Sequence, residues 1–114
     1  MATSTFALPL DKSKVQKAKE FVEHQKGARN EQFKDMTQRH GVQRVQVWLQ
    51  EEPPVVIVQL TTPDVGKAHM SHSESDHEFD VWMKNMMKEI HGVDFHGISA
   101  SDHPQAKLVV DHSG

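Results

Sequence analysis

The stretch SDHEFDVWMKNMMKEIHGVDF, from Ser75 to Phe95, predicts the element around which the rest of the chain is arranged. Its apolar residues recur at steps of three and four, which is the period of a helix with one apolar face. These residues are Phe79, Trp82, Met83, Met86, Met87 and Ile90. The opposite face carries Asp80, Lys84, Asn85, Lys88 and Glu89. We therefore expect an amphipathic helix that packs one side against a core.

The sequence also indicates where this helix begins and ends. Ser75 and Glu78 have the spacing of a capping box, and the charges of Asp76 and Glu78 suit the positive end of a helix dipole. Gly92 follows His91 at the position where a left-handed residue commonly ends a helix. We therefore expect the helix to lie between Ser75 and His91.

Composition limits the class of protein. A chain of 114 residues has the length of a single domain, which we expect to span residues 1–114. The net charge of −3 offers no basic surface for nucleic acid, so nucleic acid is not an expected partner. The absence of cysteine excludes disulfides, thiolate nucleophiles and cysteine-ligated metals. No stretch approaches the ~20 apolar residues of a membrane span, and the first residues lack a signal-peptide pattern. We expect a soluble, cytoplasmic protein.

Ahead of the main helix, strand and helix patterns alternate. Thr3–Leu10 predicts a first strand, and Asp11–Lys26 predicts a helix with Asp11 as its N-cap. Asn30 stands at the N-cap position of a second helical pattern over Glu31–His40.

A hairpin and a loop follow. Val42–Gln50 alternates apolar and polar residues, as a strand does, and Val55–Leu60 predicts its antiparallel partner across the turn at Glu51–Pro54. Thr61–Ser73 is expected to be a loop with at most one helical turn. Beyond the main helix, Ala106–Asp111 predicts a last strand.

The predicted order is strand, helix, strand, strand, helix, strand. This order indicates an α+β fold of the ferredoxin-like βαββαβ type, with a four-stranded antiparallel sheet and its helices on one face. The strand Val55–Leu60 has apolar residues on both faces, and Trp48 lies on a face that the helices would not cover. Because monomers rarely expose a large apolar patch, we expect a second copy to cover this face, which makes the protein a homodimer.

This layout and the segment FDVWMKNMMKEIHGVDF, residues 79–95, resemble the dimeric α+β barrel superfamily. Its small members include proteins of the antibiotic-biosynthesis-monooxygenase type and stress-responsive barrel proteins. The resemblance implies two ferredoxin-like subunits whose sheets form a shared barrel, with a pocket between each sheet and its own helices. It also implies a range of activities that includes cofactor-free oxygenases, isomerases, decarboxylases and haem-binding enzymes, and the fold alone does not choose among them.

Two histidines mark the two ends of the main helix. His77 lies in its first turn with Asp76 beside it and Asp80 one turn later, and a carboxylate that orients an imidazole makes a general acid or base. His91 ends the helix at the edge of the apolar stripe, with Asp94 three residues on. The simpler interpretations are a solvated residue for His77 and a contact with the helix dipole and last carbonyls for His91.

Other residues of these elements are candidates for the wall of a ligand site. They are Trp48, Trp82, Met83, Met86 and Arg44. The tryptophans suit a core or a dimer contact as well as a cavity wall. The methionines suit an adaptable pocket or ordinary packing. An arginine suits a substrate carboxylate or a solvated strand surface.

Histidines also gather just before the main helix. His69, His72 and Asp76 lie within eight residues of one another, and imidazole with carboxylate suits zinc, nickel, copper or ferrous iron. The spacing matches no established metal motif, and a flexible polar loop explains the same residues.

These patterns favour a homodimeric barrel that binds a small apolar or aromatic molecule between sheet and helices. We expect acid–base catalysis of the monooxygenase, isomerase or cyclase class by His77 or His91, aided by Asp80 or Asp94, without a tightly bound cofactor. Two alternatives remain open at this point. One is a non-enzymatic binding or stress-response dimer, and the other is a metal or haem protein that uses the histidine-rich segment or His91.

Overall fold

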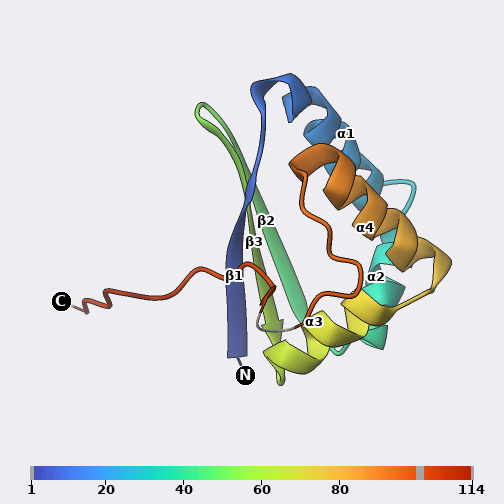
Figure 1. Cartoon of the computed structure of the whole chain (residues 1–114), viewed down its shortest axis with the longest axis vertical. Coiled ribbons are helices and arrows are strands. Elements are labelled where there is room, and N and C mark those ends of the chain that lie inside the picture. Colours follow the sequence, from blue (N-terminus) through green and yellow to red (C-terminus); the bar gives the residue numbers. More distant parts are fainter. Residues whose placement is uncertain (1, 100–101, 114) are drawn as a thin grey trace.

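The computed structural model describes residues 2–99 and 102–113, and over these residues the chain has an α+β fold (Figure 1). Three strands form an antiparallel sheet in this described part, in the order β1-β3-β2. The strands are β1 (Ala2–Pro9), β2 (Arg44–Glu51) and β3 (Pro54–Thr62). All three strands were predicted from the sequence, and β2 with β3 forms the expected antiparallel hairpin.

The sheet has one covered face and one open face. Phe6 of β1 is opposite Val58 of β3, and Val47 of β2 is opposite Val58 on the other side. Phe6 and Val58 are buried, because their side chains point toward the helices. The next row across the sheet is Ala7, Ile57 and Trp48, which points the other way.

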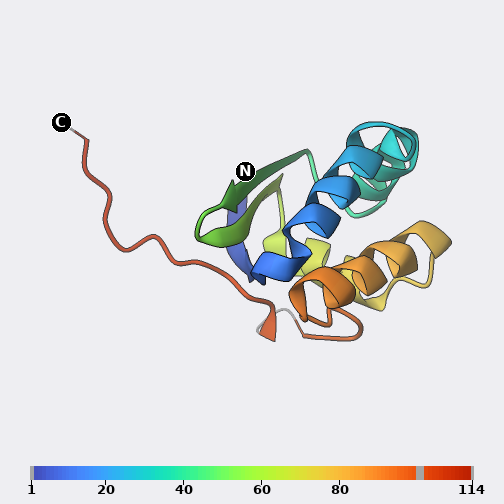
Figure 2. The same cartoon turned by 90° about the horizontal axis from the view of Figure 1, so that it is seen from above.

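The helices cover a single face. Lys12–Lys14 forms a 3-10 turn that leads into α1 (Val15–Lys26), and α4 (Glu78–His91) packs beside α1 (Figure 2). The Asp11 side chain accepts from Ser13 N at 2.9 Å and so caps the 3-10 turn, while the N-cap of α1 itself is Lys14 rather than the predicted Asp11. None of the helices in residues 2–99 and 102–113 combines the length and the apolar character that a membrane span requires.

The core forms between the helices and the covered face of the sheet. It consists of buried apolar side chains from β1, β3, α1, α2 and α4 and from the segment after α4. The buried members are Phe6, Leu8, Leu10, Ala18, Phe21, Met36, Val56, Val58, Phe79, Met83, Ile90 and Phe95. The apolar stripe of the main helix therefore faces this core, as its periodicity predicted.

The second helical pattern is α2 (Asn30–Arg39), with a start that differs from the prediction. Asn30 is its first helical residue rather than its N-cap. The side-chain amide of Asn30 donates to the carbonyl oxygen of Gln25 at 3.2 Å, and so ties α2 to the end of α1.

The predicted capping box of the main helix is wrong. The N-cap of α4 is His77, whose Nδ1 accepts from Phe79 N at 3.3 Å. Ser75 instead ends the preceding helix, and its hydroxyl donates to the carboxylate of Asp80 at 2.6 Å. The predicted end is confirmed, because Gly92 has the left-handed φ of 71° and its N–H donates to Lys88 O.

The segment expected to be mostly loop contains a ten-residue helix, α3 (Val65–Glu74). Its N-cap is Asp64, whose carboxylate accepts from Lys67 N at 3.0 Å. The helix buries Ala68, His69 and Ser73. Polar and small residues hid this helix from a search for apolar periodicity, since its buried face consists of two polar residues and an alanine.

The predicted last strand over residues 106–111 is absent from the structure, where these residues are extended and unassigned to the sheet. Ala106 N donates to Thr5 O of β1 at 2.6 Å, and the chain then runs past β1 and away from the helices (Figure 1). Leu108, Val109 and Val110 are exposed by 80%, 86% and 66%. Among the described residues, Ala106 is the one point where a backbone hydrogen bond joins this segment to β1, so the fourth strand is not formed and the ferredoxin-like layout remains a prediction.

Candidate functional site

A cavity of about 120 Å³ lies between the sheet and the helices. Most of its wall is apolar and comes from side chains of the three strands and of α1, α2 and α4. Val47 of β2, which is 40% exposed, lines the cavity at the edge of the sheet. The exceptions among its lining are chiefly four histidines, His40, His69, His72 and His91. An apolar cavity with a few polar groups is the usual form of a small-molecule site.

Helix α3 brings two of these histidines to the cavity. His69 and His72 are three residues apart, so they lie on the same side of the helix. The Nε2 atom of His69 is 3.0 Å from Ser4 Oγ, and its ring stacks on His103 with centroids 3.5 Å apart. Burial, together with the nearby His103, lowers the pKa of His69 to about 4, so this imidazole is neutral at pH 7.

His72 is the least satisfied polar group of the cavity. Its Nε2 atom is buried and has no hydrogen-bond partner among the residues that the structure describes. Burial and the neighbouring His40, which outweigh the attraction of Asp80, lower the pKa of His72 to about 4. A neutral imidazole nitrogen that meets no protein partner is free to hydrogen-bond a ligand.

His91, at the end of α4, has a defined tautomer. Its Nδ1 lies 2.8 Å from the carbonyl oxygen of Pro9, and a carbonyl can only accept, so Nδ1 carries the proton. Burial lowers the pKa of His91, and the bond to Pro9 opposes that shift only in part. In the neutral ring, Nε2 therefore keeps its lone pair and can accept a proton.

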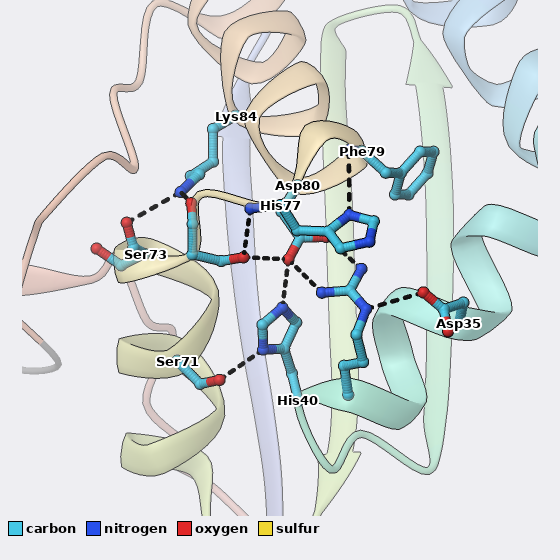
Figure 3. A network of polar contacts seen from close by, with 10 residues as sticks. Asp35, His40, Ser71, Ser73, His77, Phe79, Asp80 and Lys84 are labelled. Carbon is cyan, nitrogen blue, oxygen red and sulfur yellow. Dashed lines mark hydrogen bonds and ion pairs between the residues drawn. The ribbon is translucent and has the colours of Figure 1, made fainter.

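A second constellation lies beside the cavity, where α2, α3 and the first turn of α4 meet (Figure 3). Its centre is the fully buried carboxylate of Asp80. Arg39 holds this carboxylate with two hydrogen bonds of 2.7 and 2.9 Å, and Ser75 adds a third of 2.6 Å. His40 Nε2 is 2.7 Å from the same carboxylate, and His40 Nδ1 is 2.6 Å from Ser71 Oγ.

The hydrogen bonds fix the charge of Asp80. Burial is the largest single influence and would raise its pKa, but the bonds from Arg39, Ser75 and His40 together lower it well below the usual range. Chiefly through the same bond to Asp80, the pKa of Arg39 is raised. Asp80 is thus an anion throughout the neutral range, and Arg39 is its permanent counter-ion.

The structure separates the histidine predicted at the start of the main helix from the cavity. His77 is exposed and caps α4, while Asp80, its expected partner, bonds to His40 and Arg39. His91 does line the cavity, but Asp94 accepts from His96 N at 2.9 Å and lies 3.8 Å from Lys88 Nζ. Neither predicted carboxylate has the position expected of it.

The candidate wall residues have three different locations. Met83 lines the cavity, while Met86 packs against the core cluster from its edge. Trp82 packs against Phe21 and Phe79, with its ring 4.1 Å from the Arg29 guanidinium carbon. Trp48 and Arg44 share the open face of the sheet, on the side away from the cavity.

The residues considered for a metal do not form a ligand set. His69 and His72 line the cavity, whereas Asp76 is exposed beyond the end of α3. Across residues 2–99 and 102–113, no group of three or more histidine, aspartate or glutamate side chains is close enough to hold a metal ion.

Comparison with known proteins identified no match to this chain among protein-family models, curated proteins or solved structures. The superfamily suggested by residues 79–95 therefore remains a prediction, and the structure itself supports a small α+β domain.

Sequence reasoning missed the residues that join α2 and α3 to the site. The sequence patterns place His40 at the end of a predicted helix and Ser71 in a predicted loop, and neither position indicates a functional role. His40 bonds Ser71, 31 positions later, and Asp80, 40 positions later, so no local spacing connects them. The one available signal was the His69–His72 spacing, which becomes informative only once the segment is known to be helical.

Proposed function

We propose that this protein binds a small apolar molecule in the cavity between sheet and helices and acts on it by histidine acid–base chemistry. One observation carries the proposal, namely that the buried His72 Nε2 has no partner among the described residues, in a cavity whose wall is mostly apolar. Leaving a buried polar atom unpaired costs about 1–3 kcal/mol, which a ligand with one hydrogen-bonding group recovers.

The size of the cavity selects the ligand. Its volume of about 120 Å³ is close to the roughly 150 Å³ of an engineered cavity that binds benzene. Burial lowers the pKa of three of the lining histidines, His69, His72 and His91, and so favours their neutral form. A neutral molecule with one six-membered ring and a single carbonyl or hydroxyl group fits these properties.

His72 carries out the proton transfer in this proposal. His91 bonds Pro9 O, whereas His69, one turn from His72 on α3, bonds Ser4 five residues earlier on β1, a separation of roughly 16 Å that one six-membered ring does not span. His72 Nε2 hydrogen-bonds the carbonyl oxygen in the tautomer that carries a proton there, and in the other tautomer it accepts a proton from the carbon next to the carbonyl. Return of the proton to the same or another carbon gives exchange or isomerisation without a cofactor.

A matched pair of ligands tests binding and chemistry together. Cyclohexanone and cyclohexane differ by one carbonyl, and NMR in D₂O measures both binding and deuterium uptake at the α-carbons of the ketone. We expect His72→Phe to lower the affinity for cyclohexanone by about tenfold or more, because only the ketone loses a hydrogen bond. The affinity for cyclohexane should change little. His72→Phe should also lose the protein-dependent deuterium uptake, whereas His91→Gln, which changes the other end of the cavity, should keep it.

His77→Phe is the control, since His77 is exposed outside the cavity. It should leave affinity and exchange as in the wild type. If neither ligand binds the folded protein, or if His72→Phe weakens both ligands equally, the proposed site is rejected.

We further propose that the working form is a homodimer joined through the open face of the sheet. Trp48 is 48% exposed there, and its row continues through the half-buried Ile57 to Ala7 of β1. The exposed Leu108, Val109 and Val110 leave the body next to β1, whose outer edge meets the chain at Ala106. A second copy buries both groups of apolar side chains and gives residues 106–111 a sheet edge to join.

A further inference from the structure

We infer that Ser71 is a nucleophile activated by His40, and that this serine takes the acyl group of small carboxylic esters at a site separate from the cavity. The inference rests on Ser71, His40 and Asp80, which are linked in that order by two short hydrogen bonds (Figure 3). The nucleophile and the carboxylate lie outside the cavity proposed above, because neither Ser71 nor Asp80 lines it, and only His40 borders both the cavity and the surface depression.

The direction of the hydrogen bonds follows from the charge of Asp80. An ionised carboxylate only accepts, so His40 Nε2 carries the proton that it donates to Asp80 over 2.7 Å. The other nitrogen, Nδ1, then has a lone pair, and it accepts the hydroxyl proton of Ser71 over 2.6 Å. A nucleophile bonded to a base that a third group orients is the general arrangement of an activated serine.

Burial and ion pairing hold the base in place. Asp80 is fully buried, the His40 side chain is only 7% exposed, and Arg39 fixes both oxygens of the carboxylate. Asp80 is a positioning residue, which keeps the imidazole in one tautomer and stabilises it when it takes a proton. Arg39 keeps the carboxylate ionised, so Asp80 remains a hydrogen-bond acceptor for His40 Nε2 across the neutral range.

A substrate can reach Ser71 from the surface. Ser71 and His40 line a polar depression of about 290 Å³, whose other walls include Gln38, Thr62 and Lys67. Lys67 precedes Ser71 by one helical turn on α3, so its ammonium group lies on the same side of the helix. A positive charge there attracts the carbonyl oxygen of an ester and stabilises the negative charge that it gains during attack.

The reaction balances with the groups present. Ser71 Oγ bonds to the carbonyl carbon while its proton passes to His40 Nδ1, and the tetrahedral intermediate then expels the alcohol as His40 returns the proton to it. The acyl group remains on Ser71 as an ester. Water, deprotonated by the same His40, releases it as a carboxylic acid and restores the serine.

An alkyl fluorophosphonate tests the inference, because it reacts with activated serine hydroxyls by the same attack, with fluoride as the leaving group. Peptide mapping of the folded protein should place the label on Ser71. Ser13 is an internal comparison, since its hydroxyl donates to the carboxylate of Asp11 at 2.6 Å, a weaker base than an imidazole. We expect Ser71 to react at least about 100-fold faster than Ser13, which is the lower range of a general-base effect.

Variants and unfolding complete the test. Ser71→Ala should abolish the label, His40→Gln should slow it by a similar factor, and Ser13→Ala should leave it unchanged. Urea should remove the difference between Ser71 and Ser13, because the network exists only in the folded chain. Equal reactivity of Ser71 and Ser13 in the folded wild type, which requires no variant to fold, would overturn the inference.

Discussion

A small number of buried charged side chains joins the helices of this protein to one another. Asp80 and Lys84, both predicted on the solvent side of α4, are buried to 0% and 1% exposure. Each has its partners, because Arg39 holds Asp80, and Lys84 donates to the carbonyl oxygens of Ser73 and Ser75 at 3.0 and 2.7 Å. Charges this deeply buried persist only when they are paired, so they join α4 to α2 and α3.

The lowered pKa values of His69 and His72 predict a loss of stability in acid. Both stay neutral in the folded chain down to pH about 4, whereas the unfolded chain binds these protons near pH 6.5. Their contribution is therefore complete above pH 6.5 and falls as the pH decreases toward 4. From pH 7.5 to 5, each histidine should cost roughly 2 kcal/mol of unfolding free energy.

Urea denaturation at pH 7.5 and pH 5 measures this effect. His72→Phe should reduce the loss between the two pH values, since one of the two groups no longer titrates. Met83→Leu changes the packing of the same cavity without removing an imidazole, so it should keep the full pH dependence. An unchanged loss in His72→Phe would show that this ring is not the source.

Helix α3 positions several residues of the site although few of its buried side chains are apolar. It carries Ser71 to His40, and His69 and His72 to the cavity, and it ends at Ser75, which bonds Asp80. Its packing surface is mostly polar, so hydrogen bonds at its ends and sides hold it in place. Asp64 at its N-terminus is therefore important for a helix of only ten residues.

Replacement of this cap should loosen α3 selectively. Asp64→Ala removes the bond to Lys67 N and should lower the unfolding free energy by about 1 kcal/mol, while amide exchange in α3 accelerates more than in α4. Asp64→Asn keeps a capping oxygen and should be close to the wild type. Equal losses for both variants would mean that Asp64 acts through its charge and not as a cap.

One face of the sheet is not covered by helices in a single copy of the chain. The helices cover one face, while the other carries Trp48, and the C-terminal residues leave three apolar side chains in solvent. A three-stranded sheet open on one face, with an extended segment beside β1, has the surfaces that a second copy would bury. The dimer proposal rests on this whole arrangement and not on any single contact.

Sedimentation at micromolar concentration tests the dimer. The wild type should sediment as a dimer, and Trp48→Glu should sediment as a folded monomer, because it places a charge in the proposed interface. Met70→Glu is the matched control, since Met70 is also exposed, by 44%, but belongs to α3. A monomeric wild type, or an equal effect of both variants, would contradict the proposed interface.

The sequence determined those elements whose side chains repeat with a clear period. The strand Thr3–Leu10 corresponds to β1, the predicted hairpin to β2 and β3, and the apolar stripe after Ser75 to α4. Gly92 also ended the main helix where its sequence placed it. Periodicity and caps are local properties, so they can be recognised in the sequence without knowledge of what each element contacts.

The tertiary structure alone decided the site. His40, Ser71 and Asp80 come from three helices, and the helical state of α3 depends on polar contacts that leave no apolar period to read. The main helix buries Asp80 and Lys84 because partners from other elements neutralise them, which no spacing within that helix reveals. Burial of charge is a property of the packed arrangement, and it determined which histidines face the cavity and which face solvent.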